Sequence, residues 1–260
     1  MKTAYGDHLT VSTEGHVATV TIDRPPNNHV SVDLMRDLAD ALETIDRDNN
    51  IRAVVLASAG KAFCAGADLV SPTGIGGTGM SGIDSLYDQA VRLFSVETPI
   101  VAAVQGAAVG AGLGLALVAD FRVVAPEARF SANFVKLGFH PGFGLTHTLP
   151  RLVGEQRANL MFLTGRRIKG EEALAWGLAD ELVPLDRLTP TAQALAAEIA
   201  ENAPLAVVAT RKTLRGDLAA AVRAQTNHEH AQQTILRATE DFAEGVRAVQ
   251  ERRAGVFKGR

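Results

Sequence analysis

Apolar and polar residues alternate over two short segments near the start of the chain. The segments are LTVST (residues 9–13) and VATVTID (17–23), both rich in β-branched residues, and Glu14-Gly15 separates them. A period of two with β-branched residues is typical of strands, and the short polar connection predicts a hairpin.

The spacing of apolar residues changes after Ser31. Leucines at 34, 38 and 42 and an isoleucine at 45 recur on one helical face, and Ser31 is a good N-cap for that helix. Three later apolar runs predict buried strands: RAVVLAS (52–58), PIVAAVQG (99–106) and FRVVAP (121–126). Helices are expected over 83–97 and 113–120.

Strands that alternate with helices predict an α/β fold with largely parallel pairing. The strand pattern ends near residue 185, and the remaining chain has the spacing of helices. We therefore expect a core over residues 1–185 and a helical C-terminal region over 186–260. The apolar surface of segments 192–203 and 218–248 exceeds what one helical tail needs, which indicates self-association.

Composition narrows the class of protein further. The formal net charge is -3 and 47% of the residues are hydrophobic, so nothing indicates a nucleic-acid surface. The single cysteine, Cys64, excludes an internal disulfide and favours a reducing compartment. No signal core and no apolar run of membrane-spanning length is present, so we expect a cytoplasmic protein without a membrane partner.

Two glycine-rich stretches could be ligand loops. The first, GIGGTG (74–79), matches a dinucleotide-binding fingerprint by letter, but no predicted strand leads directly into it, so we interpret it as a surface loop. The second, GAAVGAGLG (106–114), follows an apolar strand and opens a helix. Its free amides could bind an anion or a developing oxyanion. The glycines could equally serve close packing of helix and sheet.

The second stretch gains meaning from a segment that precedes it. AFCAGADL (62–69) and residues 104–120 resemble, in order and separation, the two signature segments of the crotonase (enoyl-CoA hydratase/isomerase) superfamily. Further similar segments are DRP (23–25), LG (137–138), PG (141–142), LPRLVG (149–154), LTG (163–165), EALAWGL (172–178) and ERRAGVFK (251–258). The resemblance covers nearly the whole chain.

The resemblance implies a spiral of ββα turns with a helical C-terminal region that forms trimers, commonly paired into hexamers. It implies an acyl-CoA ligand in fatty acid metabolism, with coenzyme A arriving as part of the substrate and no permanently bound cofactor or metal. The backbone N–H groups of Ala67 and Ala111 would form an oxyanion hole, which stabilises an enolate through two preorganised donors.

The resemblance also implies the residues that contact substrate and coenzyme A. They are Arg24, Pro26, Asn28, Ala65, Gly66, Asp68, Leu69, Gly110, Gly114, Asn133, Phe134, Phe257 and Lys258. The last two would close over the nucleotide, from the same or a neighbouring subunit. The sequence departs from the family pattern at His29, which either lines the nucleotide pocket or faces solvent.

The acid/base residues of a hydratase are missing. Family hydratases use two glutamates, and the matching positions hold Gly114 and Phe134, which cannot carry a proton. His140, on a loop that should border the acyl pocket, is the candidate acid/base group, although it could simply hydrogen-bond its own loop. Cys64 has no cationic neighbour in the sequence and is interpreted as a packing residue.

Three functions remain open from the sequence. The first is a CoA-thioester lyase, isomerase or thioesterase that works through an enolate. The second is a homologue that binds CoA esters without turnover. The third is a β-diketone-type C–C hydrolase on the same fold, which requires a His/Asp arrangement that the sequence does not match.

Overall fold

The computed structural model of this 260-residue chain describes residues 3–68 and 75–260. Seven strands form the larger sheet in the order β1-β2-β3-β4-β6-β8-β11. They are β1 (Ala4–Tyr5), β2 (Leu9–Glu14), β3 (Val17–Ile22), β4 (Ala53–Ser58), β6 (Ile100–Val104), β8 (Phe121–Val124) and β11 (Glu181–Leu182). The pairs from β3 to β11 are all parallel, as the alternation of strands and helices predicts.

A second sheet of four short strands lies beside the first. Its order is β10-β9-β7-β5, with β5 (Ala62–Cys64), β7 (Ala107–Val109), β9 (Arg129–Ser131) and β10 (Arg167–Lys169). Each of β5, β7 and β9 follows a strand of the larger sheet after a few residues and precedes a helical segment. The chain therefore winds through repeated ββα turns, as the crotonase resemblance implies.

Ten α-helices and two 3-10 helices surround the sheets in the described part of the chain. The α-helices are α1 (Val32–Asp46), α2 (Ile75–Ser95), α3 (Ala111–Ala116), α4 (Leu145–Val153), α5 (Glu155–Thr164), α6 (Gly170–Trp176), α7 (Leu188–Ala200), α8 (Pro204–Arg215), α9 (Leu218–Arg237) and α10 (Glu240–Gln250). The 3-10 helices are η1 (Asn133–Leu137) and η2 (Leu185–Arg187). None of the described helices is long and apolar enough to cross a membrane.

The first predicted elements form as expected. β2 and β3 pair in antiparallel register from Leu9 opposite Ile22 to Glu14 opposite Val17, which confirms the hairpin. The Ser31 side chain accepts a hydrogen bond from the backbone N–H of Leu34 at 3.2 Å, so Ser31 caps α1. This bond satisfies one of the free donors at the helix start.

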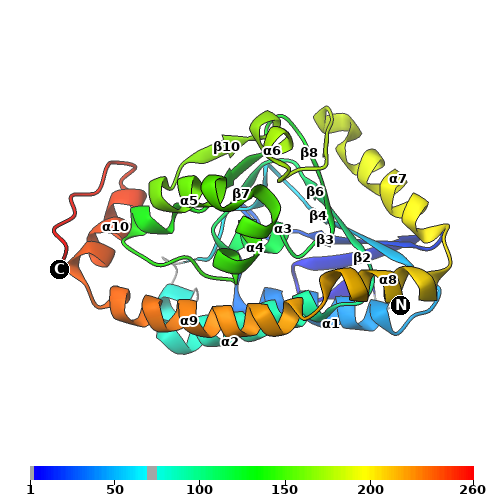
Figure 1. Ribbon diagram of the computed structural model, residues 1–260, viewed down its shortest axis with the longest axis horizontal. Coiled ribbons are helices and arrows are strands. Elements are labelled where there is room, and N and C mark those ends of the chain that lie inside the picture. The colour runs from blue at the N-terminus through cyan, green and yellow to red at the C-terminus, as the bar shows by residue number, and fades with distance from the viewer. Residues whose placement is uncertain (1–2, 69–74) are drawn as a thin grey trace.

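Both faces of the larger sheet are buried. Along β4, Val54 and Leu56 join the core cluster that includes α1, α2 and α3, while Ala53 and Val55 join a second cluster with α7. The pleat explains this division, because successive side chains point to opposite faces. Figure 1 shows α7 alone on one side of the strands, away from α1 and α2.

The packing of α7 changes one inference from the sequence. Leu188, Ala192, Ala196 and Ala200 of α7 are all buried against the sheet. The apolar pattern of residues 192–200 therefore covers a face of this chain's own sheet and needs no second subunit. As an argument for self-association, that part of the pattern is wrong.

The expected loop over the first glycine-rich stretch is also wrong for residues 75–79, because α2 begins at Ile75 rather than near Ile83. Gly74 lies outside the described residues. Once a helix has formed, each added residue gains a hydrogen bond, so it can extend through glycines that cost about 1 kcal/mol each.

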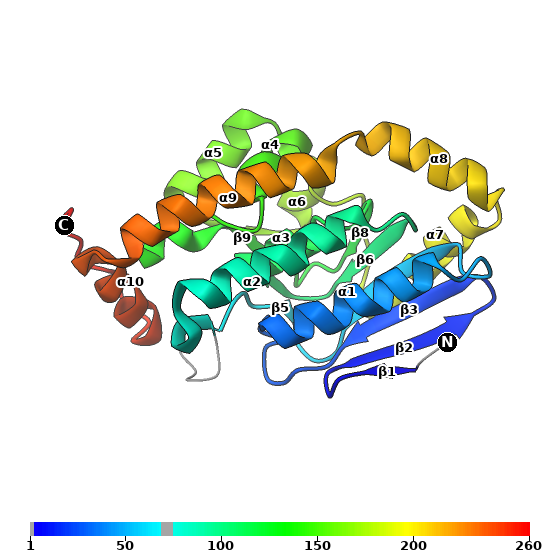
Figure 2. The same cartoon turned by 90° about the horizontal axis from the view of Figure 1, so that it is seen from below.

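The C-terminal helices pack along the core. α9 runs beside α2 in both views of the ribbon (Figures 1 and 2), and α10 lies at the far end of the molecule with the chain terminus. The last residues fold back on α10, where the Asp241 carboxylate accepts hydrogen bonds from the backbone N–H groups of Lys258 and Gly259 at 2.6 and 2.8 Å.

Candidate active site

A cavity of about 280 Å³ opens where α3, η1 and the loop after β5 meet α2, α9 and α10. Nine of its lining residues come from positions singled out in the sequence: His29, Ala65, Gly66, Ala67, Asp68, Gly110, Ala111, Asn133 and Phe134. They arrive from four separate segments of the chain. The fold therefore brings together the two signature segments at a single concave site.

The backbone amides of Ala67 and Ala111 both border this cavity. Within the described residues, neither N–H donates a hydrogen bond to a protein acceptor. The neighbouring groups are paired: the Gly110 N–H donates to the Ser131 carbonyl at 2.9 Å, and the Val30 N–H donates to the Gly66 carbonyl at 2.9 Å. These bonds fix the two loops and leave two donors free for a ligand.

Glycines allow the two loops to approach closely. Gly66 has a φ of 101° and Gly110 a φ of 55°, both in the region that disfavours side chains. A Cβ on Gly112 would lie 2.0 Å from the Cys64 carbonyl oxygen. Close packing, one of the two alternatives left open for the second glycine-rich stretch, is therefore confirmed, and it brings the two free amides to one site.

The positions that match the hydratase glutamates are apolar and crowded. A Cβ on Gly114 would lie 2.4 Å from Cδ1 of Phe143, so the Phe143 ring occupies the space that a side chain at 114 would need. Gly114 itself does not line the cavity, in contrast to its expected role in binding. The Phe134 ring lies in the lining beside Gly110.

His140 does not line the cavity. Its Nδ1 lies 2.7 Å from the carbonyl oxygen of Pro141, and its ring meets His228 edge-on at 6.1 Å between centroids. This is the loop hydrogen bond that the sequence left as the alternative. The geometry gives no support to His140 as the acid/base group.

Three described lining residues have ionisable side chains: His29, Asp68 and Tyr87. Nδ1 of His29 lies 3.3 Å from the Gly66 carbonyl oxygen, which places the imidazole beside the loop of Ala67. Burial raises the pKa of Tyr87 far above its ordinary value, so its hydroxyl stays protonated and acts as a donor.

The remaining predicted contact residues lie outside the lining, and Leu69 lies outside the described residues. Asn28 is 2% exposed and donates to the carbonyls of Ala59 and Ala62 at 2.8 Å each, so its side chain fixes the loop. Arg24 donates to the His29 carbonyl at 2.6 Å. Pro26, Phe257 and Lys258 are exposed and do not border the cavity.

Cys64 and Asp120 have structural rather than catalytic surroundings. Cys64 is fully buried, and burial raises the pKa of its thiol to about 11, which suits packing rather than nucleophilic attack. Asp120 pairs with Arg211 and Arg215 at 2.9 and 3.0 Å and ties α8 to the sheet.

Sequence reasoning missed the lining residues that α2 and α9 supply. Ile83, Leu86 and Tyr87 come from α2, and Gln233 comes from α9. The helical spacing of the first three was visible, but nothing local indicates that these helices close a site formed by loops far away in the sequence.

The ββα winding thus brings two glycine-rich loops, each with a free backbone amide, to one cavity. The enoyl-CoA hydratase/isomerase family model matches residues 12–260. The chain therefore belongs to this family, within the crotonase superfamily. A probable enoyl-CoA hydratase of Mycobacterium tuberculosis is 39% identical over 88% of this chain and 90% of its own. The 1,2-epoxyphenylacetyl-CoA isomerase of Escherichia coli is 34% identical over 95% of this chain and 97% of its own.

Solved structures show the same fold. An enoyl-CoA hydratase/isomerase from Pseudoalteromonas atlantica superposes with a TM-score of 0.86 at 34% identity, covering 97% of this chain and 100% of that chain. An enoyl-CoA hydratase from a subspecies of Mycobacterium avium superposes with a TM-score of 0.83 at 29% identity, over 96% and 98% of the two chains.

Proposed function

We propose that this protein binds an acyl-CoA thioester with its carbonyl oxygen between the backbone N–H groups of Ala67 and Ala111, and stabilises the enolate formed there. The observation that carries the proposal is the pair of free amides on facing glycine-rich loops at one cavity. Two such donors stabilise an oxygen that becomes negative more than they stabilise a neutral carbonyl.

The reaction is enolate chemistry of the isomerase or lyase type rather than hydration. Adding water to a double bond needs positioned acid/base groups, and both family positions are apolar here. Phe143 also fills the space beside Gly114. His29 and Asp68 are the described groups at the cavity that remain able to accept a proton.

The acyl group carries no charge. The described lining contains no arginine or lysine that could balance a carboxylate on the acyl group. Most of the lining side chains are aliphatic or aromatic. Burying an unpaired carboxylate in such a cavity would cost far more than the contacts return.

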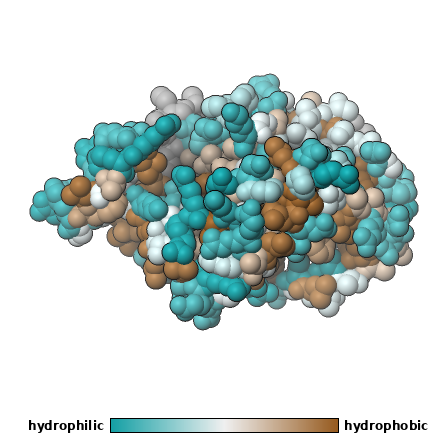
Figure 3. Space-filling view, turned by 90° about the horizontal axis from the view of Figure 1, so that it is seen from above, coloured by the Kyte–Doolittle hydropathy of each residue, from teal (hydrophilic) through white to brown (hydrophobic). Residues whose placement is uncertain are grey.

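Self-association forms part of the same proposal. Leu205, Leu214 and Ile235 on the C-terminal helices are 81%, 78% and 65% exposed. We propose that a trimer or a pair of trimers covers these exposed side chains of the C-terminal helices, since apolar patches mark interaction sites. The face seen in Figure 3, on the opposite side of the molecule from the view in Figure 2, also carries apolar patches among hydrophilic side chains.

A proline substitution tests the oxyanion hole. Ala111 is the first residue of α3, where proline is usually tolerated, and Ala111→Pro removes the N–H without deleting a protein hydrogen bond. Loss of one such donor typically lowers kcat by about 10²–10³-fold, because the developing oxyanion loses a hydrogen bond. The affinity for acetoacetyl-CoA, whose α-carbon readily forms an enolate, should fall by that order in isothermal titration.

The control is Ala111→Val, which adds bulk at the same position and retains the donor. It should weaken binding much less than proline. Circular dichroism and thermal unfolding establish that both variants are folded. A folded Ala111→Pro variant that binds acetoacetyl-CoA as tightly as the wild type would refute the proposed role of this amide. Exchange of the α-proton of a bound acyl-CoA with D₂O distinguishes an enzyme from a protein that only binds.

A further inference from the structure

The turn between η1 and α4 forms one wall of the cavity. Phe143 and Gly144 have φ angles of 66° and 70°, so the chain takes two consecutive left-handed residues here. Such a conformation is unfavourable for phenylalanine and persists only where surrounding contacts hold it. The Phe143 side chain is nevertheless 1% exposed and well packed.

The contacts that hold the turn come partly from a buried polar face of α9. Glu229 is fully buried, and its carboxylate accepts hydrogen bonds from the Gly144 N–H at 2.7 Å, the Thr146 N–H at 3.0 Å and the Thr146 hydroxyl at 2.6 Å. Three donors on one carboxylate fix both the backbone and the start of α4. Residue 144 is therefore anchored directly after Phe143.

The other side of the turn is anchored through Gln233 and Tyr87. The Tyr87 hydroxyl donates to Oε1 of Gln233 at 2.8 Å, and Nε2 of Gln233 donates to the His140 carbonyl at 2.9 Å. A Cβ on Gly142 would lie 1.8 Å from the Tyr87 hydroxyl oxygen, so the turn presses against this pair. Hydrogen bonds therefore anchor the chain both before Phe143, at His140, and after it, at Gly144.

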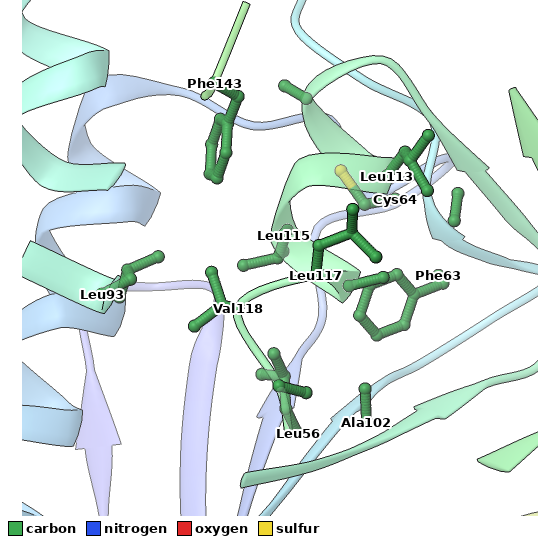
Figure 4. Close-up of a cluster of buried hydrophobic side chains, with 14 of the residues drawn as sticks. Leu56, Phe63, Cys64, Leu93, Ala102, Leu113, Leu115, Leu117, Val118 and Phe143 are labelled. Atoms are coloured by element: carbon green, nitrogen blue, oxygen red, sulfur yellow. The ribbon is translucent and has the colours of Figure 1, made fainter. Parts of the chain in front are cut away.

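Phe143 lies at the buried end of the cavity. Val249 and Gln250 of α10 are exposed lining residues, whereas Tyr87 and Phe143 are 5% and 1% exposed. In Figure 4 the Phe143 ring points into the space between the helix of Leu93 and the short helix of Leu115. It packs on Gly114, one helical turn beyond Ala111, where an acyl chain leaving the oxyanion hole would continue.

We propose that Phe143 is the residue that limits acyl chain length, and that Glu229, Gln233 and Tyr87 are positioning residues that hold it. This inference rests on the proposed binding of an acyl-CoA thioester. It adds that the preferred ligand has a short apolar acyl group, because the aromatic ring closes the inner end of the cavity.

Binding of saturated esters tests the role of Phe143 without turnover. Butyryl-CoA, octanoyl-CoA and free CoA are titrated calorimetrically into the wild type, Phe143→Ala and Phe143→Leu. Each newly buried methylene contributes a factor of about four in affinity. Phe143→Ala should therefore raise the octanoyl-to-butyryl affinity ratio by at least about 15-fold, the equivalent of two methylenes, while the affinity for free CoA stays constant.

Phe143→Leu retains more of the core packing and should raise the same ratio by a smaller factor. It keeps the test decisive if the alanine variant fails to fold. A ratio that stays at the wild-type value in a folded Phe143 variant would overturn the assignment.

Tyr87→Phe tests the positioning role. It removes only the hydroxyl that anchors Gln233, and Tyr5→Phe is a matched control because Tyr5 is similarly buried but lies in β1. A hydrogen bond typically contributes about a fivefold factor, so Tyr87→Phe should raise the octanoyl-to-butyryl ratio by up to about fivefold. Tyr5→Phe should leave the ratio unchanged. Equal effects of both substitutions would show that Tyr87 acts only on general stability.

The titrations distinguish failure of the proposed acyl-CoA binding from failure of the chain-length role of Phe143. A wild-type protein that binds neither ester would overturn the proposed function and this inference with it. A wild-type protein that binds both esters, with ratios unchanged in the variants, would overturn only the chain-length role of Phe143.

Discussion

Replacing Gly114 with alanine should destabilise the protein, although the same change usually stabilises a helix. Gly114 is a buried residue of α3, and alanine is favoured over glycine in a helix interior by about 1 kcal/mol. Here the new Cβ would lie 2.4 Å from Cδ1 and 2.9 Å from Cβ of Phe143. Overpacking of this kind typically costs about 1–3 kcal/mol. The free energy of unfolding should therefore fall by up to about 2 kcal/mol.

A double-mutant cycle isolates the clash. Phe143→Gly removes both the ring and the Cβ, and glycine readily adopts the φ of 66°. In that background Gly114→Ala should be neutral or stabilising by about 1 kcal/mol, which gives a coupling energy of about 1–3 kcal/mol. Urea unfolding followed by circular dichroism measures all four proteins.

The result bears on the reaction as well as on stability. A Gly114→Ala variant that is more stable than the wild type, with no coupling to Phe143, would show that the ring does not fill this space. The site would then have room for a side chain at 114, and the structural argument against hydration would fail. The expected coupling would instead show that a hydratase-type acid cannot be restored at 114 without changing Phe143.

Three further predictions concern activity, assembly and pH. Hydration of crotonyl-CoA, followed by absorbance, should be at least about a thousandfold slower than in a two-glutamate relative; an equal rate would contradict the role given to Gly114 and Phe134. Light scattering at micromolar concentration should report a trimer or hexamer, and a clean monomer would refute self-association. Burial raises the pKa of Glu229 from 4.5 to about 7, so the stability that its protonation contributes is present below pH 4.5 and lost as pH rises to 7. Relative to Glu229→Gln, the wild type should lose up to about 3 kcal/mol across that range in urea unfolding, and parallel pH profiles would contradict the raised pKa.

The sequence predicted the elements whose signals are local. The Ser31 cap and the hairpin around Glu14-Gly15 depend on neighbouring residues, and both form as predicted. The strands of the smaller sheet, such as β5 and β7, have only three residues each, too few for a periodic pattern. Their existence depends on pairing with each other, which local spacing does not reveal.

The sequence predicted the two loops of the site but not the helices that line the rest of the cavity. The loops of Ala67 and Ala111 contain glycine-rich motifs that can be recognised in the sequence, and the loops meet at one cavity. The buried face of α9 carries Glu229 and Gln233 and therefore resembles a solvent-facing surface. Only the tertiary contacts with Tyr87 and the turn at Phe143 determine that this polar face is inside.

A crystal structure with a bound saturated acyl-CoA tests the central claim most directly. Our account predicts that the thioester oxygen lies about 2.7–3.1 Å from the backbone nitrogens of both Ala67 and Ala111, with the acyl group in the cavity and its end against Phe143. A thioester oxygen that contacts neither amide, or an acyl group outside this cavity, would contradict it.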